Sequence, residues 1–329
     1  MRRRDFIKGI VGSAGAWPLA AYAQQQSAMP VVAIVNLGTA EANARFVNAF
    51  SKGLEEAGWV EGQNVTVEYH WLEGQFDHLS SLMADLVRRR VAVIATPAGN
   101  YASQVAKAAT TTIPIVFGVG EDPVKLGLVS SLARPGGNVT GYNFFNAEVT
   151  AKRLELLHAL VPKAVRVAML VNPANVPVAD TTSRQAQEAA RAIGLQLHIL
   201  NASTDDEIEA AFDILARDRP DALFIPADAF FVSRRVQLAA LTARYRIPTA
   251  YPTRENVEAG GLMSYGPDLL EMWRQVGVYT GRVLSGAKPA DMPVMQSTKF
   301  DFVLNLKTAK TLGLDVPMTI QMTADEVVE

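Results

Sequence analysis

Val32-Ala33-Ile34-Val35-Asn36 near the start of the chain and Val167-Ala168-Met169-Leu170-Val171-Asn172 near its middle decide the fold. Each is a continuous apolar run that ends in asparagine, as is typical of a strand buried on both faces of a parallel sheet. The pair Ile113-Pro114 and Ile247-Pro248 repeats in the same way. The offsets are 136 residues from Asn36 to Asn172 and 134 residues from Ile113 to Ile247. A near-constant offset predicts two similar halves.

Around these runs, apolar strand patterns alternate with helical patterns. In the first half, strands are expected at 31–35, 64–71, 91–95 and 113–117, and helices at 41–57, 77–90 and 100–109. In the second half, strands are expected at 165–171, 195–200, 222–225 and 247–251, and helices at 180–193, 205–217 and 233–244. The order βαβαβαβ predicts a parallel sheet with helices on both faces. We therefore expect an α/β protein with two Rossmann-like lobes.

The remaining C-terminal segment is too short for a third lobe. It reads as strand 262–265, helix 268–285, strand 299–304 and helix 305–312. We expect the chain to cross back to lobe one here and then to return to lobe two. Lobe one is then 29–142 plus 262–287, and lobe two is 143–261 plus 288–329. The turn-forming points expected near the hinge are Gly136-Gly137, Gly260-Gly261 and residues 286–289.

The N-terminus has the pattern of an export signal. Arg3-Arg4-Asp5-Phe6-Ile7-Lys8 precedes a short apolar stretch and the small-x-small site Ala21-Tyr22-Ala23, so residues 1–23 are predicted to be a signal peptide. The twin arginines favour the Tat route over an ordinary Sec signal. The stretch is too short for a bilayer span, which needs roughly 20 apolar residues.

Composition narrows the possible partners and the compartment. The chain has no cysteine, which excludes disulfides and a lipid anchor on a cleavage-site cysteine. We therefore expect a periplasmic protein that is free of the membrane. Removing residues 1–23, which carry +3, would change the net charge from -2 to -5. This mildly acidic balance argues against a nucleic-acid partner.

Several stretches of the chain resemble the ABC-transporter substrate-binding family related to the tryptophan/tyrosine-binding proteins. They are Gly58–Val65, Thr112–Phe117, Asp122–Val129, Arg134–Gly141, Gly260–Gly266 and Asn305–Leu314. The resemblance covers nearly all of the chain after the signal peptide. It implies the type I periplasmic-binding fold, with two Rossmann-like lobes joined by a hinge of three crossovers. We expect a monomer without cofactor or catalysis that binds a small molecule and works with a membrane permease and its ATPase.

The ligand site is predicted from the strand ends, because ligands of open parallel sheets bind beyond the carboxyl ends of the strands. That rule, with the crossover strand, selects Asn36, Thr96, Ala98, Asn100, Gly118, Asp122, Asn172, Asp228, Phe230, Tyr251, Ser264 and Tyr265.

Each type of side chain has two interpretations at this stage. In one interpretation, Thr96 and the backbone amides that follow it bind a ligand carboxylate at the start of a helix. In the other, Thr96 is only the N-cap of that helix. Asp228 is favoured over Asp122 as the acceptor of an ammonium, because Asp122 before a proline also suits a helix cap. Asn36 and Asn172 can both donate and accept, as amide recognition requires, or they reflect a turn preference.

Aromatic residues near the expected cleft point to the ligand class. Tyr251 is the first choice for a ring that stacks on a flat ligand, followed by Phe230 or Phe231. Together with the resemblance, this favours an amino acid or a similar small zwitterion, and an aromatic one is among the candidates.

Two other functions remain open. A periplasmic sensor that presents its ligand to a receptor would share the fold and the cleft. A secreted hydrolase would need a carboxylate pair, which the many acidic residues permit. The segment Asn36–Glu41 lacks the dinucleotide fingerprint, and we find neither a Walker loop nor a Gly-x-Ser-x-Gly elbow. The four histidines are dispersed, so no metal site is expected.

Overall fold

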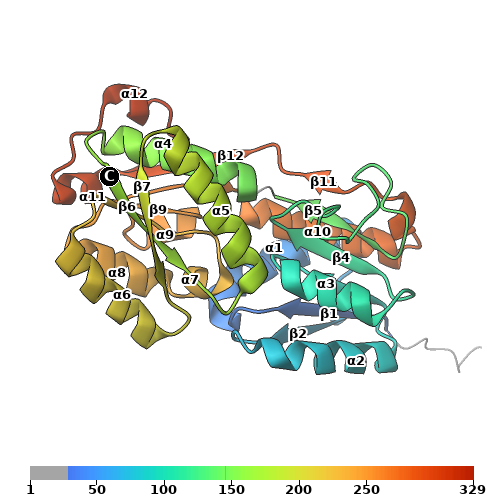
Figure 1. Ribbon diagram of the computed structural model, residues 1–329. Helices are drawn as coiled ribbons and strands as arrows, with labels where there is room; N and C mark the ends of the chain where they lie inside the picture. The colour runs from blue at the N-terminus through green and yellow to red at the C-terminus, as the bar shows by residue number, and fades with distance from the viewer. Residues whose placement is uncertain (1–28, 145) are drawn as a thin grey trace, which may run out of the picture.

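The computed structural model describes residues 29–144 and 146–329, so the predicted signal peptide lies outside the described residues. Two α/β lobes lie side by side (Figure 1). Lobe one holds β1 (Val31–Asn36), α1 (Ala40–Glu56), β2 (Thr66–Trp71), η1 (Phe76–His78), α2 (Leu79–Arg89), β3 (Val93–Thr96), α3 (Asn100–Ala109), β4 (Ile115–Val119), β5 (Val139–Asn143), α10 (Leu269–Leu284), η2 (Pro289–Asp291) and β11 (Met295–Gln296).

Lobe two is formed by the middle of the chain and its C-terminus. It holds α4 (Asn146–Leu160), β6 (Arg166–Val171), α5 (Val176–Ala192), β7 (Gln196–Asn201), α6 (Asp205–Asp218), β8 (Ala222–Phe224), α7 (Ala229–Ser233), α8 (Arg235–Tyr245), β9 (Thr249–Tyr251), α9 (Arg254–Glu258), β10 (Met263–Pro267), β12 (Phe300–Asn305), α11 (Leu306–Leu312), α12 (Met318–Gln321) and β13 (Glu326–Val328).

The two sheets confirm the predicted α/β architecture. Lobe one has the strand order β11-β5-β4-β3-β1-β2, and lobe two has β13-β12-β10-β9-β8-β6-β7. All of the lobe-one pairs are parallel, whereas β10 and β12 in lobe two pair in the antiparallel sense. The chain crosses between the lobes after β5, after β10 and after β11. These are the three crossovers that the resemblance implied.

The predicted lobe boundaries need correction at the crossovers. β10 was assigned to lobe one, but its residues pair with β9 and β12 in the lobe-two sheet. Residues 288–296 were assigned to lobe two, but β11 pairs with β5 in lobe one. The error arises because β5, which contains Gly141 and polar residues, was not predicted as a strand. The proposed hinge glycines instead lie in turns within one lobe or the other.

Alternating residues of the central strands bury opposite faces of each sheet, as a period of two requires. In lobe one, Val32 and Ile34 pack beneath α1 and α10, while Ala33 and Val35 pack beneath α2 and α3. In lobe two, Met169 packs toward α4 and α5, and the adjacent Ala168 and Leu170 pack toward α6 and α8.

Helices α1 and α10 approach each other closely because glycine lies at their contact. A Cβ atom at Gly53 would be 1.9 Å from the carbonyl oxygen of Arg274, and one at Gly277 would be 2.1 Å from that of Phe50. No side chain could be added at either position without moving a backbone. This contact fixes the two helices that carry Phe46 and Trp273 toward the interlobe space.

Candidate ligand-binding cleft

The carboxyl ends of the parallel strands of both lobes face one cleft, where three adjoining cavities share Asp228. The aromatic cavity, lined by Phe46, Phe144 and Trp273, has a volume of about 100 Å³. The arginine cavity, lined by Glu121 and Arg153, has a volume of about 80 Å³. The outer cavity lies near Phe230 and has a volume of about 260 Å³. All three take residues from both lobes, so a ligand here would contact both.

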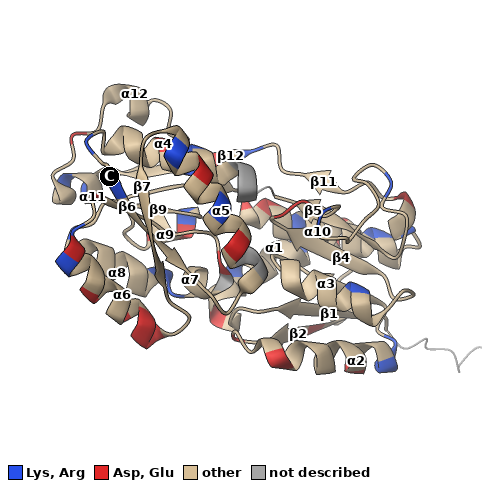
Figure 2. Ribbon diagram, viewed as in Figure 1, with Lys and Arg blue, Asp and Glu red and all other residues tan. Residues whose placement is uncertain are grey.

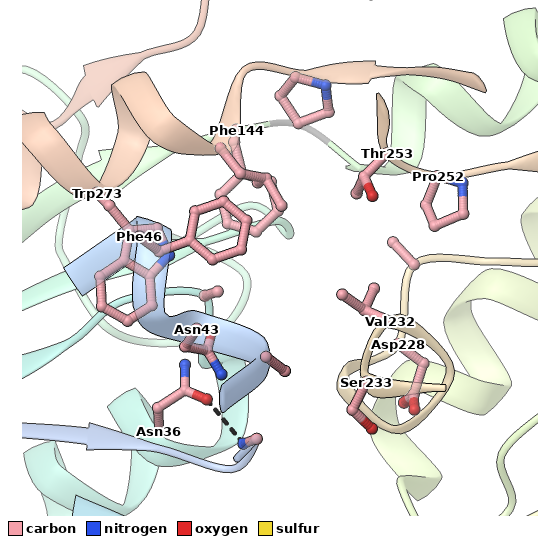
Figure 3. A pocket seen from close by; sticks show the side chains of 16 residues that line it. Asn36, Asn43, Phe46, Phe144, Asp228, Val232, Ser233, Pro252, Thr253 and Trp273 are labelled. Atoms are coloured by element: carbon pink, nitrogen blue, oxygen red, sulfur yellow. Dashed lines mark hydrogen bonds between the residues drawn. The ribbon is translucent and has the colours of Figure 1, made fainter. Parts of the chain in front are cut away.

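Three aromatic side chains form the lobe-one wall of the aromatic cavity (Figure 3). The rings of Phe46 and Trp273 stack with 5.8 Å between centroids and 18° between planes. Phe144 lies beside them, directly after β5. Asn36 lies below the rings, where it accepts a hydrogen bond from the Gly38 amide at 2.7 Å and donates to the Pro97 carbonyl at 2.9 Å.

The opposite wall belongs to lobe two and is organised by Asp228. This carboxylate accepts hydrogen bonds from the side chains of Asn172 at 3.0 Å and Asn175 at 2.8 Å. It also accepts from the Phe230 amide at 2.9 Å and so begins α7. Ser233 lies close to Asp228 in Figure 3, on the lobe-two side of the aromatic cavity.

The arginine cavity places charged groups of both signs at the other end of the cleft. Arg153 of α4 is only 2% exposed, and burial lowers its pKa to about 9. Glu121 follows β4 in lobe one, and burial raises its pKa. Elsewhere, acidic and basic residues are interspersed over both lobes (Figure 2).

Ion pairs also join the two lobes beside the aromatic cavity. Arg45 of α1 binds the carboxylates of Glu255 and Glu258 in α9, the latter at 2.8 Å. Glu255 is 7% exposed, so this pair is partly shielded from water. The lobes are therefore in direct contact at the edge of the cleft.

Six of the predicted site residues line these cavities. Asn36 and Ala98 reach the aromatic cavity, Asn100 the arginine cavity, Asn172 and Phe230 the outer cavity, and Asp228 all three. Ala98 has a φ of 58°, in the left-handed region, at the turn into α3. Their contact with a ligand remains a prediction.

The other six predicted residues lie outside these cavities. The correction matters most for Tyr251, which is fully buried in the lobe-two core with its hydroxyl 2.7 Å from that of Thr242. Thr96 bonds Ser103, and Asp122 accepts from the Val124 amide, so Asp122 acts as a turn cap. The remaining three are packed residues: Gly118 lies under Met272, Ser264 is 1% exposed, and Tyr265 stacks on Phe300.

The strand-end rule missed the side chains that helices bring to the cleft. Phe46 and Trp273 lie on α1 and α10, and Arg153 lies on α4, a helix that was not predicted. Trp273 sits within a predicted amphipathic helix, but the sequence did not show which buried aromatic would border a cavity. Arg153 precedes Leu154 on a largely buried helix. Because arginine is rarely buried, a cation at such a position is the sequence signal that could have pointed to a functional role.

Within residues 29–144 and 146–329, no group of three or more His, Cys, Asp or Glu side chains is arranged to hold a metal ion. In the same residues, no helix is both long enough and apolar enough to cross a membrane.

The fold and the cleft define a bilobal ligand-binding protein. The family model of the ABC transporter substrate binding protein matches residues 31–328, and the chain belongs to that family. The members it resembles are described as binding proteins rather than as enzymes.

Individual relatives are similar over most of the chain. The tyrosine-binding protein of Clostridioides difficile strain R20291 is 27% identical over 268 residues, which is 80% of this chain and 75% of that protein. A Streptococcus pneumonia ABC domain in complex with L-Trp has a TM-score of 0.81 at 24% identity, over 92% of this chain and 100% of that one. The ligand-free, open structure of a Clostridium difficile substrate binding protein with adhesive properties has a TM-score of 0.64 at 25% identity, over 92% and 99%.

Proposed function

We propose that this protein is the ligand-capturing component of an ABC importer and that it binds an aromatic amino acid or a similar small zwitterion. The observation that carries the proposal is the composition of the interlobe cleft. One end has stacked aromatic rings, the other has buried charged groups, and each cavity takes residues from both lobes. A zwitterion with a flat side chain would satisfy both ends at once.

The chemistry of the two ends supports this ligand class. A ring in the aromatic cavity gains apolar contact and a stacking interaction with Phe46 and Trp273, worth about 0.5–1.5 kcal/mol beyond area burial. Asp228 and Glu121 supply negative charge for an ammonium group. The tyrosine-binding relative agrees with the same class.

Capture would proceed by closure of the two lobes. The ligand binds one lobe first, and contacts made only in the closed state drive the closure. The closed surface then docks on a membrane permease, whose ATPase supplies the work. We propose export through the predicted Tat signal to the periplasm, where the absence of cysteine leaves the mature chain without a cysteine-linked lipid anchor.

Isothermal titration calorimetry with L-tyrosine, L-tryptophan and L-phenylalanine tests the proposal. Wild-type protein should bind at least one of them, and Asp228→Asn should bind it at least tenfold more weakly, because asparagine keeps the helix cap but removes the charge. Asp213→Asn, an exposed position on α6, is the matched control and should bind as wild type does. If wild type binds none of the three amino acids, the proposed ligand class is wrong.

A further inference from the structure

Arg153 is a buried cation on α4 that lines the arginine cavity. Its Nε donates to the Tyr265 carbonyl at 2.8 Å, and its guanidinium lies 5.5 Å from the centroid of the Phe224 ring. Its Nη2 atom is buried and has no hydrogen-bond partner among the described residues. Within those residues, no carboxylate forms an ion pair with it, and the guanidinium is held by the Tyr265 carbonyl and the Phe224 ring.

Such an arrangement is costly in the absence of an anion. Burying a charge without a counterion costs several kcal/mol, and a group in that situation tends to lose its charge. The pKa of Arg153 is lowered for this reason, because burial disfavours the charged form. At neutral pH the guanidinium remains protonated, so the cavity that it lines is ready to accept a negative group from outside the chain.

The lobe-one side of the same cavity is also suited to an anion. The residues that face Arg153 there include Gly99, Asn100 and Tyr101, at the first turn of α3. This turn has no side-chain cap at its N-cap position, so the free amides of its first residues and the positive end of the helix dipole favour an anion there. Glu121 from lobe one and Asp228 from lobe two are the acidic groups that line the cavity.

The position of Arg153 ties it to the hinge. Nη2 lies 3.8 Å from where a Cβ atom of Gly266 would be, at the end of β10 where the chain crosses to lobe one. A Cβ at Gly266 would also be 2.1 Å from the Pro252 carbonyl oxygen, so glycine is needed here. The guanidinium therefore lies where the lobes meet, and an anion bound to it would also contact α3.

We propose that Arg153 is the anchor of the ligand carboxylate, which it holds against the first turn of α3 when the lobes close. This inference rests on the proposed function and assigns the two ends of its ligand: the carboxylate lies in the arginine cavity, and the ring lies against the wall formed by Phe46 and Trp273. The cavities share Ala98, Phe144 and Asp228, so one small molecule can extend from one to the other.

The test compares ligands that differ in the carboxylate alone. Calorimetry uses L-tyrosine and L-tryptophan, together with tyramine and tryptamine, which lack the carboxylate. Wild-type protein should prefer the amino acid to its amine by at least 30-fold, because a buried charge-assisted pair is lost. Arg153→Met, which keeps an apolar chain over Phe224, should lose that preference. Arg191→Met, an exposed arginine on α5, is the matched control and should keep it.

Two results can be told apart. If wild type binds L-tyrosine and tyramine within threefold of each other, or if Arg153→Met keeps the preference, the inference is wrong while the proposed function stands. If wild type binds none of the four probes, the proposed ligand class fails and the inference fails with it.

Thermal denaturation of the ligand-free variants separates this role from a structural one. If Arg153 is retained for ligand binding, an apolar residue should replace it without loss of thermal stability, as is found for other buried charges. We expect ligand-free Arg153→Met, and Arg153→Leu as a second variant, to melt at or above the wild-type Tm. A fall of more than 5 °C in both variants would show that the guanidinium serves the fold and would overturn the inference.

Discussion

At the scale of the residue, Phe46 offers the sharpest test of the aromatic cavity. Phe46→Leu keeps apolar volume but removes the ring that stacks on Trp273. We expect affinity for L-tyrosine to fall about 2- to 12-fold, which corresponds to the 0.5–1.5 kcal/mol of an aromatic pair. Titration calorimetry measures the change.

The control for this variant lies one helical turn away. Phe50 is fully buried on the same face of α1 but does not line the cavity. Phe50→Leu should lower stability as much as Phe46→Leu does and should leave the affinity unchanged. Equal losses of affinity in both variants would show that the effect is general loosening of lobe one.

Glu121 is expected to make ligand binding pH-dependent. Burial raises its pKa, so in mildly acidic solution part of the population carries a neutral carboxyl group. An ammonium in the cavity favours the ionised form. Affinity for L-tyrosine should therefore rise as pH increases through the raised pKa of Glu121 and then level off.

Calorimetry between pH 4.5 and 7.5 measures this dependence. Glu121→Gln should flatten the affinity profile and should also remove the proton release that buffers of different ionisation enthalpy detect. The other charged groups near the carboxylate are Arg153 and Asp228, which line the same cavity, and Arg184 of α5. A profile that keeps its slope in Glu121→Gln would show that Glu121 does not cause the pH dependence.

At the scale of the element, the ion pairs between α1 and α9 are expected to stabilise the closed arrangement of the two lobes. Arg45 holds Glu255 and Glu258 across the cleft, and an open form would break both pairs. Arg45→Ala should reduce affinity for L-tyrosine about 5- to 30-fold, because the closed state loses one partly buried and one exposed ion pair. The loss should appear as faster dissociation in stopped-flow measurements.

Lys52→Ala is the matched control, because Lys52 is exposed on the same helix. L-Tyrosine should dissociate from this variant at the wild-type rate. Raising the salt concentration should reduce the difference in dissociation rate between wild type and Arg45→Ala, because salt screens the exposed Arg45–Glu258 pair. An unchanged rate in Arg45→Ala would show that these ion pairs do not hold the closed state.

At the scale of the whole molecule, ligand binding should stabilise both lobes together. Three crossovers join them, and each cavity in the cleft is lined from both sides. L-Tyrosine at 100 times its Kd should add about 2.7 kcal/mol, which raises Tm by about 5 °C for a chain of this size. Differential scanning calorimetry should show one transition that moves as a unit.

Solution scattering gives a second readout of the same expectation. The radius of gyration should fall when L-tyrosine is added to wild type and should fall less in Arg45→Ala. Two calorimetric transitions, of which the ligand moves only one, would place the binding site within a single lobe and would contradict capture between two.

The strands at the centre of each sheet could be predicted from sequence because strands that are buried on both faces consist of consecutive apolar residues. Val32–Val35 and Val167–Val171 are buried on both faces, and their boundaries in the structure agree closely with the predicted ones. Asn36 and Asp228 follow such strands, which is why the strand-end rule found them in the cleft. Local pattern was sufficient in these places because a strand buried on both faces is a continuous run of apolar residues.

The tertiary structure alone decided which elements each lobe contains and which side chains the cleft receives. β10 resembles other apolar strands, and only its pairing with β9 and β12 places it in lobe two. Tyr251 and Trp273 are both buried aromatics, yet one fills a core and the other borders a cavity. The sequence by itself determined two Rossmann-like halves. The partners across the cleft, Arg153 and Glu121 among them, are residues far apart in the chain that only the packing of one lobe against the other brings together.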